Sequence, residues 1–268
     1  MITENSPIGV FDSGVGGISV LRALRETLPK ENFLFFGDSQ NAPYGEKSPA
    51  QIRELADHSL RFLRERGAKA VIIACNTATS AAADYLRKKY PEMILIGMEP
   101  AIKPAALAIR NGAKPCVLVM ATPATIRGER LHHLLSRYHE DADYRLLPAP
   151  KIVRFVEAGQ EQSDALRDYL RDILSPYRSI DDTTPPALKL DSIVLGCTHF
   201  PFIRQQLREC IGYPVAFFDG ARGTARETLH RLAERKLLRE TAAPGSIALF
   251  SSSGSTALME RLLQLPIE

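Results

Sequence analysis

Two cysteines in matching surroundings are the residues best suited to chemistry. Cys75 follows the apolar run Val71–Ala74, Cys197 follows the run Ile193–Gly196, and polar residues come directly after each cysteine. A cysteine between the end of a strand and the start of a helix lies near free backbone N–H groups and the positive end of the helix dipole. Both stabilise a thiolate, which is a base or a nucleophile near neutral pH.

Two thiols on opposite sides of one substrate could invert a stereocentre. One thiolate would remove a proton from carbon and the other thiol would deliver a proton to the opposite face, without a cofactor. A structural zinc site needs four ligands in close pairs, and Cys197 with His199 has no such pair, so we expect no metal. A disulfide switch, or an acyl-transfer nucleophile served by His199, stays open at this point.

The other two cysteines are expected only to pack. Cys116 begins an apolar run and Cys210 lies in a helical segment after Leu207, and cysteine is among the most often buried residue types. Four scattered cysteines in 268 residues do not form a disulfide framework, so reduced thiols are expected.

The glycine-rich turn Phe11–Gly17 has some features of a dinucleotide fingerprint. In G-x-G-x-x-G counted from Gly14, Ser19 stands where glycine or alanine is needed, although Asp38 lies at about the spacing of a ribose-binding acid. We favour a nest of backbone N–H groups for a carboxylate. Asp12 would then face an ammonium group or tune a thiol.

The chain also resembles itself, which predicts how these residues are positioned. Cys75 and Cys197 lie 122 residues apart, and the similar openings at Pro7 and Pro115 are about 108 residues apart. Two copies of one α/β unit would explain both offsets, because ligands of parallel sheets bind beyond the carboxyl ends of the strands. We predict strands over residues 7–11, 32–36, 70–74, 94–97, 116–120, 192–195 and 215–218, helices over 48–66, 163–174 and 224–239, and a surface loop over 176–189.

Composition restricts the class of protein. The chain has 45% hydrophobic and 24% charged residues and a formal net charge of +3 without a basic run, so we expect a small-molecule substrate and neither a nucleic-acid nor a membrane partner. The apolar runs are too short to span a membrane. The N-terminal residues lack the pattern of a secretory signal, so we expect a cytoplasmic protein. As a separate expectation, the protein forms a homodimer.

Five motifs together resemble the glutamate racemase family. They are Phe11–Gly17, Pro43–Gly45, Ala74–Thr79, Phe155–Gly159 and Leu195–Pro201, and they cover nearly the whole chain in the family's order. The resemblance implies cofactor-independent interconversion of L- and D-glutamate for peptidoglycan. It further implies two pseudo-symmetric α/β domains with mainly parallel central sheets and an active site in the interdomain cleft. The domains would be residues 1–98 with 215–268, and residues 99–214.

The same resemblance assigns roles to residues. Cys75 would take the proton from D-glutamate and Cys197 from L-glutamate, with Asp12 and His199 assisting. The implied substrate contacts are Asp12, Ser13, Tyr44, Gly45, Asn76, Thr77, Thr122, Thr125, Glu157, Thr198 and His199. The chain departs from the family's usual sequence at Asp38–Ala42 and Phe218–Gly220. A racemase of another amino acid such as aspartate, or a nucleotide-binding regulatory protein, are the alternatives.

Overall fold

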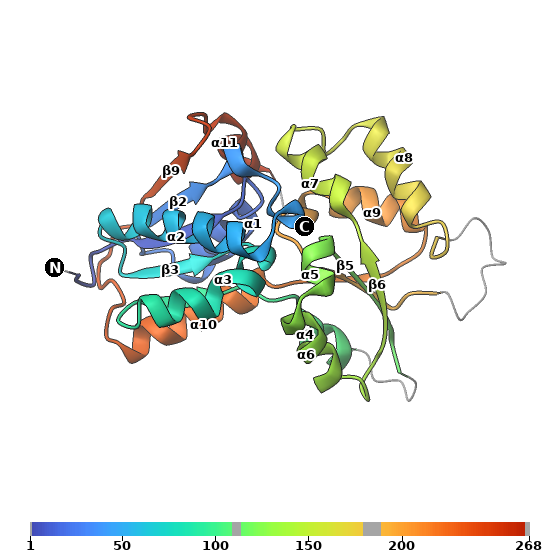
Figure 1. Ribbon diagram of the computed structural model, residues 1–268, viewed down its shortest axis with the longest axis horizontal. Coiled ribbons are helices and arrows are strands. Elements are labelled where there is room, and N and C mark those ends of the chain that lie inside the picture. The colour runs from blue at the N-terminus through green and yellow to red at the C-terminus, as the bar shows by residue number, and fades with distance from the viewer. Residues whose placement is uncertain (1, 109–113, 179–188, 266–268) are drawn as a thin grey trace.

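The structure is a computed structural model that describes residues 2–108, 114–178 and 189–265. Two α/β units lie side by side, each built on its own parallel sheet (Figure 1). Most of the loop predicted over 176–189 lies outside the described residues. None of the helices within the described ranges has the length and apolar composition to cross a membrane.

The first unit has a five-stranded sheet in the order β4-β3-β1-β2-β9, with every pairing parallel. Its strands are β1 (Ile8–Asp12), β2 (Phe33–Gly37), β3 (Ala70–Ile73), β4 (Ile94–Gly97) and β9 (Ile247–Ser251). Its helices are α1 (Ile18–Thr27), α2 (Pro49–Glu65), α3 (Asn76–Lys89), α10 (Ala221–Glu234) and α11 (Ala257–Gln264), with short 3-10 turns η1 (Ser39–Asn41) and η2 (Tyr44–Glu46).

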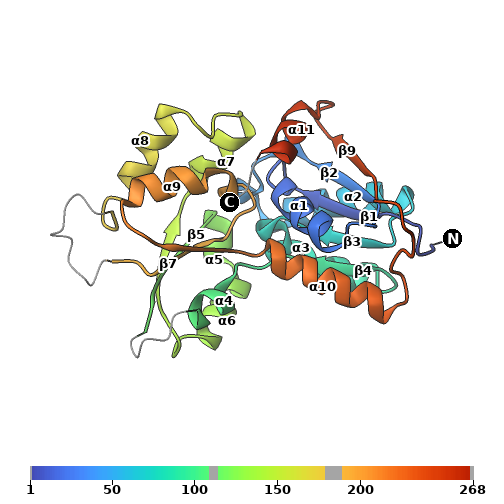
Figure 2. The same cartoon turned by 180° about the vertical axis from the view of Figure 1, so that it is seen from behind.

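Apolar residues alternate along these strands and fill a core on each face of the first sheet. Val10 and Ile72 pack with α1, α10 and α11, whereas Phe11 and Ile73 pack with α2 and α3. Figure 2 shows α10 running along α1 beside β4, and the contacts between these elements agree. The sheet is therefore buried on both faces, as parallel sheets are.

The second unit has a four-stranded parallel sheet in the order β6-β5-β7-β8. Its strands are β5 (Cys116–Ala121), β6 (Asp143–Pro148), β7 (Ser192–Leu195) and β8 (Ala216–Asp219). Its helices are α4 (Ile102–Leu107), α5 (Pro123–Arg127), α6 (Glu129–Arg137), α7 (Pro150–Glu157), α8 (Asp164–Ile173) and α9 (Arg204–Ile211), and the 3-10 turn η4 (Phe200–Ile203) precedes α9.

The two sheets share one strand order, which confirms the predicted duplication. If β1 to β4 are matched in sequence with β5 to β8, each sheet has the order second, first, third, fourth, and β9 is an addition beside β2. The match makes β3 equivalent to β7 and β1 equivalent to β5. The strand before Cys75 therefore corresponds to the strand before Cys197.

Two predicted boundaries need correction near the return to the first unit. The predicted first-unit segment starts at residue 215, but β8 pairs with β7, so residues 216–219 belong to the second sheet. The helix predicted over 224–239 spans Ala221–Glu234 instead. It begins early because the Asp219 carboxylate accepts the Ala221 N–H at 2.9 Å, and it ends before Lys236, whose φ of 54° is left-handed.

The other predicted elements agree with the structure to within one or two residues, and two strands went unpredicted, β6 and β9. The helix predicted over 48–66 has the expected capping box, in which Ser48 and Gln51 each accept the other's backbone N–H. Gly67, with φ of 80°, follows its end in the left-handed region.

Candidate active site

The carboxyl ends of equivalent strands carry the candidate side chains. Asp12 ends β1, Cys75 follows β3, Thr122 follows β5, and Cys197 follows β7 by two residues. Cys75 and Cys197 are 6% and 7% exposed. The duplicated fold therefore places two buried thiols at matching positions of two facing units.

Cys75 caps α3. Its Sγ accepts the Ala78 N–H at 3.4 Å and lies 3.4 Å from the Ser13 hydroxyl. Burial raises the pKa of the Cys75 thiol well above its ordinary range, and the Asp12 carboxylate and an ionised Cys197 raise it further. The contacts with Ser13 and Ala78 lower this pKa by less. The helix start thus stabilises the thiolate as predicted, but burial and the neighbouring negative charge outweigh it.

Cys197 has a histidine beside it. Its Sγ lies 3.6 Å from Nδ1 of His199, and Nε2 of the same ring lies 2.5 Å from Oε1 of Glu157. Burial lowers the pKa of His199, but the contacts with the Cys197 sulfur and the Glu157 carboxylate raise it more, so the net pKa is above its ordinary value. The ring is therefore favoured as an imidazolium. Glu157 also accepts the Val15 N–H at 2.7 Å, so it joins the two units.

Asp12 is a fully buried carboxyl group between the two cysteines' loops. Its Oδ2 accepts the Gly17 N–H at 2.7 Å and the Thr198 hydroxyl at 3.3 Å. Its Oδ1 is buried and has no hydrogen-bonding partner in the described part of the chain. Burial raises the pKa of Asp12, and the nearby His199 opposes this.

A cluster of three threonine hydroxyls spans the two units. Thr77 Oγ1, on α3, lies 2.9 Å from Thr122 Oγ1 and 3.2 Å from Thr125 Oγ1. Thr122 also caps α5 by accepting the Thr125 N–H. A Cβ on Gly45 would lie 3.0 Å from Thr122 Cβ, so a side chain there would crowd this cluster.

Tyr44 is positioned by an acid that the sequence suggested only as a ribose ligand. The buried Tyr44 hydroxyl donates to Asp38 at 2.7 Å, and the Asn41 amide donates to the same carboxylate. Asp38 therefore holds the η1–η2 segment in place. Burial and the Asp38 charge raise the pKa of the Tyr44 phenol, which stays a hydrogen-bond donor.

Asn76 supplies hydrogen-bonding groups that the protein leaves unused. Its Oδ1 and Nδ2 are buried, and neither has a partner among the described residues. Buried polar groups in native proteins are nearly always hydrogen-bonded. With Asp12 Oδ1, Asn76 marks where a polar ligand would complete the site.

Ion pairs that sequence reasoning missed connect the two units around these residues. Arg154 on α7 pairs with Glu46 at 2.7 Å, Arg130 on α6 pairs with Asp84 at 2.5 Å, and Arg261 on α11 pairs with Glu161. Nothing in the local sequence predicts them, because each joins residues distant in the chain.

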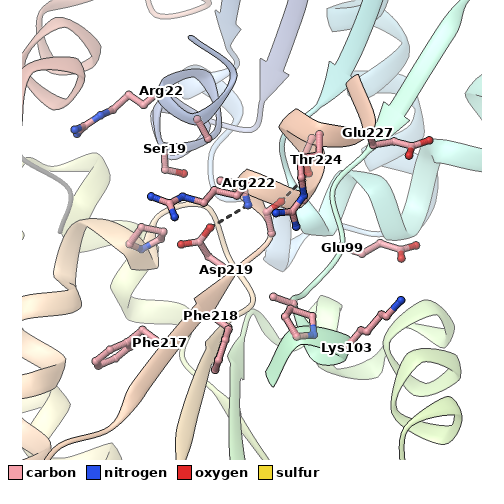
Figure 3. A pocket seen from close by; sticks show the side chains of 18 of the residues that line it. Ser19, Arg22, Glu99, Lys103, Phe217, Phe218, Asp219, Arg222, Thr224 and Glu227 are labelled. Carbon is pink, nitrogen blue, oxygen red and sulfur yellow. Dashed lines mark hydrogen bonds between the residues drawn. The ribbon is translucent and has the colours of Figure 1, made fainter. Parts of the chain in front are cut away.

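The candidate site is distinct from a large pocket on the described part of the chain. That pocket has a volume of about 850 Å³ and lies where α1, the β4–α4 connection and the start of α10 meet. Figure 3 shows Arg222 and Asp219 projecting into it, near Phe218. None of the predicted site residues lines it, although Ser19 and Pro201 do. Within the described ranges, no three or more His, Cys, Asp or Glu side chains are grouped so as to hold a metal ion.

Comparisons with known proteins agree with this arrangement. The family model described as Asp/Glu/Hydantoin racemase matches residues 8–228. The chain is 43% identical over 257 residues to a glutamate racemase of Clostridium perfringens, covering 96% of this chain and 95% of the relative. A glutamate racemase of Clostridium botulinum is 40% identical, with 97% and 96% covered.

Two solved structures with the same fold contain bound glutamate. Glutamate racemase from Francisella tularensis in complex with D-glutamate has a TM-score of 0.79 at 28% identity, with 99% of this chain and 96% of that chain covered. The Escherichia coli glutamate racemase in complex with L-glutamate and the activator UDP-MurNAc-Ala has a TM-score of 0.79 at 30% identity, with 97% and 94% covered.

Proposed function

Because the chain belongs to the Asp/Glu/Hydantoin racemase family, we propose that Cys75 and Cys197 are the acid/base pair of a glutamate racemase. The protein interconverts L- and D-glutamate, as its relatives' names indicate. The observation that supports the two roles best is the pair of buried thiols at equivalent strand ends of two matching sheets.

The reaction is two proton transfers at one carbon. With D-glutamate, the Cys75 thiolate removes the α-proton and becomes a thiol, while the Cys197 thiol protonates the opposite face and becomes a thiolate. With L-glutamate the roles reverse. The α-proton is a far weaker acid than a thiol, so a base of high pKa helps. The burial that raises the pKa of Cys75 makes its thiolate, once formed, a stronger base.

The charges beside the two thiols differ, which suits their tasks. An imidazolium at His199, supported by Glu157, lies beside Cys197, where it would stabilise negative charge on the sulfur. The Asp12 carboxylate lies between the two loops, accepts the Thr198 hydroxyl, raises the pKa of Cys75 and would attract the substrate ammonium. Preorganised donors stabilise the carbanion-like transition state without reorganisation.

The substrate contacts follow from the hydrogen-bonding groups around the thiols. We assign binding of the carboxylates and the ammonium group to Asp12, Ser13, Tyr44, Gly45, Asn76, Thr77, Thr122, Thr125, Thr198 and His199. The unused Asn76 amide supports this most directly. Glu157 is hydrogen-bonded to His199. We therefore propose that Glu157 orients the imidazole ring and does not contact the substrate directly.

The structure does not favour nucleotide binding by the glycine-rich turn. A Cβ on Gly16 would lie 2.4 Å from His199 Nδ1, and one on Gly17 would lie 2.6 Å from Asp12 Cβ. These glycines therefore allow the turn to pack against site side chains. The carboxylate of Asp38, the candidate ribose ligand, accepts a hydrogen bond from the Tyr44 hydroxyl instead. Aspartate as the substrate is not favoured either, since the relatives are named for glutamate.

We also infer the setting of the enzyme. D-Glutamate made here would supply peptidoglycan, and the protein would work in the cytoplasm as a homodimer. All four cysteines are free, and the mechanism needs two of them reduced, as a reducing compartment ensures. Sedimentation equilibrium of the reduced protein, with and without D-glutamate, tests the dimer.

Single-cysteine variants test the proposed roles. Cys75→Ala and Cys197→Ala should each abolish racemisation of either enantiomer in the presence of EDTA and without added cofactor. Cys116→Ala and Cys210→Ala are matched controls, because these thiols lie outside the site and are half-buried; both should keep near-full activity. Full activity in either site variant, shown to be folded by circular dichroism, overturns the two-thiol assignment.

A further inference from the structure

Ser19 makes a hydrogen bond from one unit to the catalytic turn of the other. It lies in the first turn of α1, is buried, and its Oγ lies 3.0 Å from the carbonyl oxygen of Thr198. Thr198 stands between Cys197 and His199. Ser19 also stands at the position where the dinucleotide fingerprint needs glycine or alanine. The proposed function assigns no role to its side chain.

The Thr198 carbonyl needs a donor from elsewhere because of the residue three positions further on. In the turn that follows β7, the Phe200 N–H donates to the Cys197 carbonyl and the Phe202 N–H donates to the His199 carbonyl. The corresponding donor for Thr198 would come from position 201. That residue is Pro201, which has no backbone N–H.

The Ser19 hydroxyl has one proton and two carbonyls within reach. Gly16 O is 2.9 Å from it, but that carbonyl already accepts the Ser19 N–H at 3.0 Å. Leaving a buried carbonyl without a donor costs about 1–3 kcal/mol. The Thr198 carbonyl therefore gains more from the hydroxyl proton than Gly16 does.

Thr198 is thereby held at two points by the first unit. Its carbonyl accepts from Ser19 and its hydroxyl donates to Asp12. The lack of a side chain at Gly16 lets the start of α1 approach the turn, since a Cβ there would lie 2.6 Å from Thr198 Oγ1. Two attachments to one residue fix the orientation of the peptide that carries Cys197 on one side and His199 on the other.

We propose that Ser19 is a positioning residue, which fixes the Cys197–His199 turn across the boundary between the two units. The proposal rests on the proposed function for its effect on catalysis. Without this bond, Thr198 keeps the hydrogen bond from its hydroxyl to Asp12 but loses the one at its carbonyl. The peptide that joins Cys197 to His199 is then less well fixed, and the Cys197 sulfur shifts relative to the α-carbon. A misplacement of about 1 Å can cost about 10²-fold in rate.

The test compares Ser19→Ala, Ser19→Thr and Thr27→Ala. Ser19→Thr keeps the hydroxyl and adds one methyl group to a residue that lines the large pocket. Thr27 lies in the same helix and its hydroxyl donates to the Ala23 carbonyl at 2.9 Å, so Thr27→Ala removes a comparable bond away from the site. Each variant is measured for kcat/KM with both enantiomers.

A second readout follows the turn without turnover. The rates at which iodoacetamide modifies Cys75 and Cys197 are measured separately by peptide mass spectrometry. We expect Ser19→Ala to lower kcat/KM by about 10- to 100-fold and to change the Cys197 rate several-fold relative to Cys75. Ser19→Thr and Thr27→Ala should match the wild type in both readouts. If Ser19→Ala does not fold, Ser19→Cys, whose thiol is a weak donor, replaces it.

Three results would overturn the proposal: unchanged kinetics and alkylation in Ser19→Ala, equal changes at both cysteines, or a Ser19→Thr variant as impaired as Ser19→Ala. Failure of the proposed function is a separate result. If the proposed function is wrong, the Cys75→Ala or Cys197→Ala variant keeps its activity. The alkylation rates report the position of the turn whether or not the two thiols are the acid/base pair.

Discussion

Nε2 of His199 lies 2.5 Å from Oε1 of Glu157. The opposite nitrogen of the ring faces the Cys197 sulfur, and the same Glu157 oxygen accepts the Val15 N–H from the first unit. The imidazole is thus fixed between a carboxylate and a thiol, and this raises its pKa despite burial. The charged group that acts on Cys75 is the Asp12 carboxylate, which raises the pKa of that thiol. The two thiols therefore have different electrostatic surroundings although their strands are equivalent.

Replacing Glu157 should lower the pKa of His199. Glu157→Gln removes the negative charge that favours the imidazolium, so the histidine should titrate at lower pH than in the wild type. The Cε1 proton chemical shift of His199, followed by NMR across pH, measures this. Signals of exposed histidines such as His58 should be the same in both proteins. An unchanged His199 titration would contradict the role given to Glu157.

The same contact should make stability depend on pH in a definite direction. Because the folded pKa of His199 is above its ordinary value of 6.5, its contribution to the free energy of unfolding is fully present below about pH 6.5 and is lost as pH rises through the folded value. Denaturant unfolding should show that Glu157→Gln destabilises the protein more at pH 6 than at pH 9. A larger loss at pH 9 would reverse the sign and reject the argument.

The pH dependence of racemisation should be bell-shaped. One thiol must be ionised and the other protonated, so kcat/KM rises while the base is formed and falls when the acid loses its proton. Burial and Asp12 raise the pKa of Cys75, so the D-glutamate reaction should increase toward alkaline pH before it declines. A flat profile from pH 6 to 10 is incompatible with a coupled thiol pair.

Removing the Asp12 charge should have opposite effects on thiol reactivity and on turnover. Asp12→Asn lowers the pKa of Cys75, because the carboxylate is among the causes that raise it. Cys75 should therefore be alkylated faster at pH 8. Racemisation should fall by about 10²- to 10⁴-fold. Asp164→Asn, at an exposed position on α8, should change neither rate. Slower alkylation of Cys75 in Asp12→Asn would contradict the claim that the Asp12 charge raises the pKa of Cys75.

The ion pair between Arg261 and Glu161 should stabilise the joined units. The Glu161 side chain is 4% exposed. Burial raises the pKa of Glu161, but the contacts with Arg261 lower it more, so the net pKa is below the ordinary value of 4.5. The stabilisation is thus present above pH 4.5 and lost as pH falls. Arg261→Met should destabilise by about 1–2 kcal/mol at pH 7 and by less at pH 4. Arg167→Met, whose partner Asp164 is 93% exposed, should cost less than about 0.5 kcal/mol.

Local sequence predicted the parts of this protein that depend on local physics. Apolar runs ending in Cys75 and Cys197 predicted the equivalent strands, and Ser48 with Gln51 predicted the start of α2. The edge strand β6 was missed because Asp143–Pro148 is partly exposed and contains Asp143, Arg145 and Pro148, so it lacks the continuous apolar run that marked the predicted strands. The edge strand β9, Ile247–Ser251, was not predicted either, although it is largely apolar.

The features that escaped prediction depend on contacts between distant residues. The raised pKa of Cys75 needs the burial and the Asp12 neighbour that only the folded chain provides. The Glu157–His199 bond joins residues 42 positions apart, and the Ser19–Thr198 bond joins residues 179 positions apart. Neither spacing has a sequence signature.

The most direct test of the two-thiol mechanism is the position of deuterium after partial conversion of L-glutamate in D2O. Cys197 would remove the α-proton and the exchanged Cys75 thiol would deliver deuterium to the other face. Early in the reaction, NMR and mass spectrometry of the separated enantiomers should find deuterium at the α-carbon of the D-glutamate product and hydrogen in the recovered L-glutamate. Equal early deuteration of both enantiomers would mean that one base serves both faces, and would contradict the mechanism.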